Sequence, residues 1–163
     1  MKSQIRRDFL GHLWDKSVVL FALMIPHGRD AIDSRGAAEL LGISYKTWLN
    51  KGGGTSYDLK PFAEGRKTLL YDRAQVEAVR DGLPLPAWPV GTRKHPGDRL
   101  DERDVAAELG VAYETVRKDR KIGRLGEWVE VCGVPHIQRS TLAGAIAARP
   151  GRGVGGGRPR KLR

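Results

Sequence analysis

The chain contains an internal repeat, and this duplication limits its possible folds more than any other feature of the sequence. Residues 32–48 align without a gap with residues 100–116, and Asp, Arg, Ala, Leu, Gly, Tyr and Thr recur at corresponding places. Further on, residues 71–76 correspond to residues 137–142 after a slip of two positions. A duplication of this kind predicts the same small supersecondary unit twice in one polypeptide.

Each copy begins with the pattern of a short helix. Asp33 and Asp101 are suitable N-cap residues, because a carboxylate oxygen can accept hydrogen bonds from the free amides of a first turn. Small and apolar residues follow at helical spacing. Gly42 and Gly110 stand where that helix has to end, since glycine readily adopts the left-handed conformation found there. We therefore expect a first helix between the aspartate and the glycine of each copy.

A second helix is predicted immediately after the glycine. Ser44 is placed to cap a helix that runs through Lys51, whereas Ala112 stands at the equivalent position and predicts a weaker cap in the second copy. Trp48 and Val116 fall on the apolar side of this helix, so we expect both in the core. Two short helices joined by a short turn containing glycine are typical of a helix-turn-helix.

A β-hairpin is predicted after each pair of helices. In the second copy, strands over residues 127–132 and 135–137 flank a turn at Gly133–Val134. In the first copy, the corresponding hairpin turns at Glu64–Gly65 and returns along Lys67–Tyr71. These hairpins would be the wings of a winged helix.

A last helix closes each unit. In the first copy it runs from Asp72 to Asp81, with Asp72 and Gln75 spaced as a capping box, and in the second it runs from Arg139 to Ala148. The order helix, turn, helix, hairpin, helix is that of a winged helix. The expected fold is therefore mainly α with small β-hairpin wings, arranged as two tandem winged helix-turn-helix modules.

The expected division of the chain follows from these units. It comprises an N-terminal helical extension (1–31), module one (32–81), a proline-rich linker (82–99), module two (100–148) and a basic Gly/Arg tail (149–163) that is expected not to fold. The extension is expected to pack on module one or, alternatively, to support self-association. The linker is expected to be a semi-stiff tether that raises avidity for two sites on one partner.

The second copy carries the residues of a family resemblance. The segment Val105–Val111, followed by Thr115–Val116, a basic wing and a helix with Arg139 and Leu142, resembles the MerR-type and excisionase-type winged helix-turn-helix. The resemblance covers about residues 32–80 and 100–148. It implies a DNA-binding fold. The long C-terminal dimerisation helix and the metal-binding cysteines of true MerR regulators have no counterpart in the sequence, so the resemblance is to the DNA-binding unit alone.

This docking mode places the start of the second helix in the major groove and the wing near the phosphate backbone. Arginine and lysine suit guanine edges, Asn50 suits adenine and Glu114 could accept from cytosine. The residues expected to contact DNA are Ser44, Tyr45, Lys46, Thr47, Asn50, Lys51, Arg66 and Lys67 in the first copy and Tyr113, Glu114, Thr115, Arg117, Lys118, Arg120, Lys121 and Arg124 in the second. Because the two second helices differ at most exposed positions, the two copies should read different half-sites.

The positive charge is concentrated in the tail. The chain has a formal net charge of +10, and residues 147–163 carry six basic and no acidic side chains. Attraction to phosphate supplies most non-specific affinity for DNA. The segment Gly157–Lys161 resembles an AT-hook core, which inserts a Gly-Arg-Pro strand into narrow minor grooves; Arg158, Arg160 and Lys161 are its candidate contacts. A generic basic tail explains the composition almost as well.

The sequence gives no pattern for catalysis, and no metal or cofactor is expected. His12, His27, His95 and His136 are scattered, and no metal-ligand spacing, nucleophile elbow or phosphate loop is present. The single cysteine, Cys132, excludes an intrachain disulfide and is expected to be a small buried residue. The longest apolar run is too short to span a bilayer. We expect a cytoplasmic, nucleoid-associated protein that is not an enzyme and has no membrane partner and no evident small-molecule ligand.

The expected function is sequence-specific binding of double-stranded DNA, as in a bacterial transcriptional regulator. An excisionase-like or plasmid- or phage-borne accessory factor that bends or loads DNA is the alternative. A helix-turn-helix used as a protein adaptor is a third interpretation, which predicts no binding to duplex DNA at moderate salt.

Deletion of residues 149–163 should lower the affinity for duplexes of every sequence, because the deleted cations contact phosphates without reading bases. Titration of one duplex at several salt concentrations should give a shallower salt dependence for the deleted chain. An unchanged slope would show that the tail makes no phosphate contacts.

Overall fold

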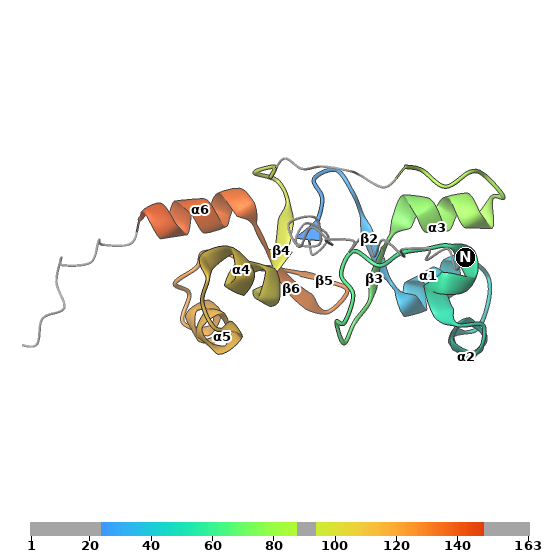
Figure 1. Ribbon diagram of the computed structural model, residues 1–163, viewed down its shortest axis with the longest axis horizontal. Coiled ribbons are helices and arrows are strands. Elements are labelled where there is room, and N and C mark those ends of the chain that lie inside the picture. The colour runs from blue at the N-terminus through green and yellow to red at the C-terminus, as the bar shows by residue number, and fades with distance from the viewer. Residues whose placement is uncertain (1–23, 88–93, 149–163) are drawn as a thin grey trace, which may run out of the picture.

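The structure is a computed structural model that describes residues 24–87 and 94–148 (Figure 1). Most of the predicted N-terminal extension, the centre of the linker, and the tail with Arg158, Arg160 and Lys161 lie outside the described residues. Within the described residues, helices and small antiparallel sheets form a mixed α and β fold. No helix among them is long and apolar enough to cross a membrane.

The two copies of the repeat have similar orders of elements and differ between the second helix and the last; we call residues 31–81 the first repeat and residues 99–148 the second repeat. The first contains β2 (Ala31–Asp33), α1 (Ser34–Leu40), α2 (Tyr45–Asn50), the 3₁₀ helix η2 (Gly53–Tyr57), β3 (Leu70–Asp72) and α3 (Arg73–Arg80). The second contains β4 (Arg99–Asp101), α4 (Glu102–Leu109), α5 (Tyr113–Lys121), β5 (Val129–Val131), β6 (Val134–Gln138) and α6 (Arg139–Ala147).

The strands lie in the middle of the molecule and the helices towards its two ends (Figure 1). β2 and β3 form a two-stranded antiparallel sheet in the first repeat. The second repeat has a four-stranded sheet in the order β1-β4-β6-β5, and its outer strand β1 (Met24–Ile25) comes from the segment that precedes the first repeat. The chain therefore enters the second sheet before it begins the first.

The predicted starts of the first two helices of each repeat are confirmed. Asp33 accepts a hydrogen bond from the Gly36 amide, and Asp101 accepts from the amides of Arg103 and Asp104 in a capping box that Asp104 completes. Ser44 accepts from the Thr47 amide, whereas Ala112 offers no side-chain cap.

The predicted glycines also take their expected conformation. Gly42 and Gly110 adopt φ values of 68° and 64° where α1 and α4 end. Only glycine takes this left-handed backbone without steric cost.

Each repeat has its own core. In the first, Trp48 is buried between Tyr57, which is stacked at 5.7 Å between ring centroids, and Tyr71, which meets it edge-on at 5.6 Å. In the second, Val116 is buried with Leu125, Leu142 and other apolar residues. The prediction that Trp48 and Val116 are core residues is confirmed.

The predicted hairpin of the first repeat is wrong. The turn at Glu64–Gly65 is present, but β3 is confined to Leu70–Asp72 and pairs with β2 rather than with a preceding strand. An isolated bridge between Pro61 and Tyr71 and a bond from the Phe62 amide to the Leu70 carbonyl close the loop. Proline lacks the amide that a paired strand needs, and Phe62 turns into an apolar cluster.

Two finer predictions in the second hairpin are also wrong. Its turn is Cys132–Gly133, one residue earlier than expected, and both residues have positive φ angles, 51° and 74°. A two-residue hairpin turn of this type needs φ > 0 at both central positions. Cys132 is consequently exposed at the turn rather than buried.

The expected capping box of α3 is only half formed. Asp72 caps the helix through the Ala74 amide, but Gln75 donates its side-chain amide to the Pro86 carbonyl at 3.0 Å instead. This bond fixes the start of the linker on the first repeat. At the other end of the linker, buried Asp98 accepts bonds from the amides of His27 and His95.

The two N-cap aspartates provide a matched pair for a stability test. Asp33→Ala should lower the free energy of unfolding by about 1 kcal/mol, the usual cost of a lost cap. Asp101→Ala should cost about 3 kcal/mol or more, because Asp101 also pairs with Arg66 and its loss leaves a buried cation without one partner. Urea unfolding of both variants measures the difference. Equal losses would show that the Arg66 contact adds nothing.

Candidate nucleic-acid interface

The second helix of each pair, α2 or α5, lies on the same edge of the molecule. In Figure 1 both stand along the lower edge, at opposite ends, while α3 and α6 lie along the upper edge. We call α2 and α5 the reading helices, because the sequence predicts that they read DNA. The loop that joins η2 to β3 descends between them towards that same edge. A rod-shaped partner laid along this edge could therefore meet both helices.

Most of the predicted contact residues on α2 are exposed. Tyr45, Lys46 and Asn50 point away from the core on which Trp48 packs, and Lys51 at the helix end is exposed as well. Ser44 and Thr47 have a local role, because their hydroxyl groups hydrogen-bond to each other at 2.8 Å at the helix start.

α5 carries a stronger positive charge. Arg117, Lys118 and Lys121 are exposed, as is Arg124 in the turn after the helix, and Val116 is the buried residue on its inner side. Glu114 and Thr115 are exposed at the helix start. This end of the lower edge suits an anionic partner best.

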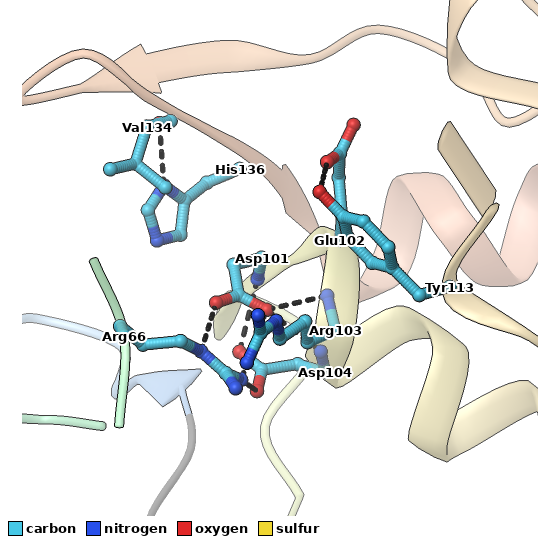
Figure 2. A network of polar contacts seen from close by, with 8 residues as sticks. All are labelled: Arg66, Asp101, Glu102, Arg103, Asp104, Tyr113, Val134 and His136. Atoms are coloured by element: carbon cyan, nitrogen blue, oxygen red, sulfur yellow. Dashed lines mark hydrogen bonds and ion pairs between the residues drawn. The ribbon is translucent and has the colours of Figure 1, made fainter. Parts of the chain in front are cut away.

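Glu102 on α4 holds two of the predicted contact residues of α5. It accepts a hydrogen bond from the Tyr113 hydroxyl at 2.9 Å (Figure 2). It also pairs with the Arg120 guanidinium at 2.5 Å. The bond to Glu102 raises the pKa of Tyr113 above its usual value. Arg120 is half-buried and also lies over the Trp128 ring, so its first role is to fix α5 against α4.

An arginine–tyrosine pair recurs in both repeats. Arg35 lies over the Tyr45 ring at 4.8 Å, and Arg103 lies over the Tyr113 ring at 5.7 Å. Each pair joins the start of the first helix to the start of the reading helix. The arginines were absent from the predicted contact set, although their identity in the two copies was the signal that could have found them. A cation held against an aromatic face beside the reading helix is well placed for a phosphate.

Arg66 was expected to contact DNA, but it binds two carboxylates of the second repeat instead. Its guanidinium donates to Asp101 at 2.7 Å and to Asp104 at 2.9 Å, and its side chain is 16% exposed (Figure 2). The sequence placed it in a DNA-contacting wing because it stands beside another cation. The neighbouring Lys67 is exposed and stays in the candidate set.

The second hairpin also turns towards the other repeat. Val131 at the end of β5 packs against the cluster of Ile25, Phe62 and Leu70, and the Cys132 sulfur lies 3.7 Å from the Ala31 carbonyl oxygen. A cavity of about 260 Å³ lies between the repeats. It is lined by the loop before β3, by the β5–β6 hairpin and by the start of α4.

Burial affects two titratable groups beside Arg66. Burial first, and then the charge of Asp101, raises the pKa of Asp104 from 3.8 to about 7, against the opposing effect of Arg66. Burial lowers the pKa of His136, whose Nδ1 lies 2.8 Å from the Val134 carbonyl oxygen. Within residues 24–87 and 94–148, no group of three or more His, Cys, Asp or Glu side chains could hold a metal ion.

Comparison with known proteins found no match to this chain among family models, curated proteins or solved structures. The contact residues described above therefore rest on the chain's own geometry.

The raised pKa of Asp104 predicts a pH dependence of stability. Between about pH 4 and pH 7 the folded protein binds this proton more tightly than the unfolded chain, so the free energy of unfolding should rise as pH falls through about 7. From about pH 8 to about pH 5.5 the protein should gain roughly 2 kcal/mol relative to Asp104→Asn.

Urea titrations of both proteins at the two pH values test this. His136 acts in the opposite direction, because its lowered pKa costs stability as pH falls, but it is common to both proteins and cancels in the comparison. The same pH dependence in both proteins would mean that Asp104 does not titrate in this range.

Proposed function

We propose that this protein binds double-stranded DNA in a sequence-specific manner and serves as a transcriptional regulator, with each repeat acting as a helix-turn-helix unit of which the second also carries a β-hairpin. The observation that carries the proposal is the common edge of the reading helices. Each buries one apolar side chain, Trp48 or Val116, and turns polar and basic residues outward. This is how a helix enters a major groove.

The distribution of charge supports the same partner. Arg117, Lys118, Lys121 and Arg124 stand together on and after α5. The two arginine–tyrosine pairs flank the reading helices at equivalent places. Contacts of this kind position a protein on the phosphate backbone, while exposed side chains such as Asn50 and Glu114 can read base edges.

An architectural role is the second candidate. Because the reading helices stand at opposite ends of one edge, a duplex that contacts both has to follow that edge, and an excisionase-like factor could use this to bend DNA. A bending assay on bound duplexes separates the candidates. Strong bending without an effect on a promoter favours the architectural role.

Selection of bound sequences from a random duplex pool tests the proposal directly. We expect two different half-sites to emerge together, because α2 and α5 differ at their exposed positions. Failure to bind any duplex at moderate salt would refute the proposal and favour a protein adaptor.

Single substitutions in the protein, measured for binding to the selected duplex, test individual residues. Lys118→Ala should weaken binding about tenfold and reduce the salt slope by about 1, because one phosphate contact is lost. Arg80→Ala removes an exposed cation from α3 on the opposite edge and should change affinity less than about twofold. Fluorescence anisotropy at several salt concentrations measures both effects. Equal losses would indicate that affinity follows net charge rather than the lower edge.

A further inference from the structure

The two repeats are joined by shared backbone pairing. Met24 pairs with Leu100 and Ile25 pairs with Arg99, so β1 belongs to the sheet of the second repeat. After a short turn, the same segment enters β2 of the first repeat at Ala31. The His27 amide donates to Asp98 at 3.0 Å, and the rings of His27 and His95 stack at 4.2 Å. Both β1 and the turn that follows it, with His27, therefore contact the second repeat or the residues just before it.

An apolar contact lies beside this pairing. Ile25, Phe62 and Leu70 are buried together, and Ala31 and Val131 pack against them. These residues come from β1, from β2, the loop and β3 of the first repeat, and from the hairpin of the second. Full burial of one such side chain stabilises the folded protein by about 1.5–3 kcal/mol. The cluster is therefore a small hydrophobic core that the two repeats share.

Arg66 adds a directional contact between the repeats. It belongs to the loop of the first repeat, and its planar guanidinium bridges two carboxylates at the start of α4 in the second (Figure 2). Asp101 caps α4, and α4 packs across α5. Any shift of Arg66 relative to α4 would break bonds of fixed geometry, since a guanidinium donates in a rigid fork.

We propose that the two repeats form one rigid reader, in which this interface rather than the linker sets the separation and helical phase of the half-sites, and that Arg66 is the positioning residue. The inference rests on the proposed DNA binding for its role in reading. The rigidity itself is testable without DNA.

Rigid and tethered readers respond differently to the spacing between half-sites. An insertion of 5 base pairs turns one half-site by about half a turn, and 10 base pairs restore the face but add about 34 Å. A flexible tether recovers affinity at 10 base pairs. A rigid reader loses one repeat's contacts at both insertions.

Distance measurement between two spin labels tests the rigidity. Labels are attached to the full chain at Ala74→Cys on α3 and Ala143→Cys on α6, two exposed positions on the helices of the upper edge. The exposed Cys132 at the hairpin turn is replaced by serine (Cys132→Ser) so that it takes no label. We expect one narrow distance distribution, which Arg66→Ala broadens, Arg66→Lys broadens less and Lys67→Ala leaves narrow. A broad distribution in the otherwise unchanged chain overturns the inference, whether or not the protein binds DNA.

Binding to the selected duplex with 1, 2, 5 or 10 base pairs inserted then tests the reading role. We expect the unchanged chain to lose about tenfold or more at every insertion, including 10. Arg66→Ala should bind the parent duplex more weakly but lose less than about threefold at 1 or 2 base pairs. A merely structural role would weaken binding to all these duplexes equally, and that result would overturn the assignment of Arg66.

The outcomes separate this inference from the proposed function. Recovery at 10 base pairs overturns the rigid reader and leaves DNA binding intact. A narrow distance distribution in a chain that binds no duplex at moderate salt overturns DNA binding, and with it the reading role.

Discussion

The ion pairs of Arg66 with Asp101 and Asp104 connect the two halves of this structure where they are least alike. Three charged groups leave water together, with side-chain exposures of 16%, 12% and 5%. Burial of this kind is costly unless the hydrogen bonds are complete. Here Asp101 and Asp104 also accept backbone amides at the start of α4. Asp101 and Asp104 therefore both start α4 of the second repeat and bind the first repeat through Arg66.

The repeats have diverged in the part that would be a wing. The first has a loop closed at Phe62, and the second has a true hairpin from β5 to β6. Both are directed at the opposite repeat, through Arg66 in one case and Val131 in the other. The loop of the first repeat and the hairpin of the second thus supply the surface between the repeats.

Local chemistry made much of the fold predictable. The N-caps at Asp33 and Asp101 and the glycine at residue 110 depend on a few neighbouring residues, so a pattern in the sequence is enough to find them. Trp48 and Val116 follow from helical spacing alone. The same spacing predicted which positions of α2 and α5 are exposed, such as Asn50 and Lys118.

The errors concern contacts between distant residues. Arg66 beside Lys67 has the pattern of a basic wing, and only a carboxylate 35 residues away changes that interpretation. Gln75 has the spacing of a capping box, but a carbonyl of the linker takes its side chain. The two residues of β1 end an apolar run and carry no strand signal of their own. The hydrophobic periodicity of a sequence predicts helices and strands, but it does not identify the strand with which a segment pairs.

The position of β1 has a consequence for how the chain is made. His27 and its partner Asp98 are 71 residues apart, so at a synthesis rate of about 5–20 residues per second the ribosome needs roughly 4–14 s to supply the second after the first. During that interval the apolar side chain of Ile25 has no sheet to join. The first repeat can complete its own core before then, but β1, the outer strand of the second sheet, stays unpaired until β4 has been synthesised.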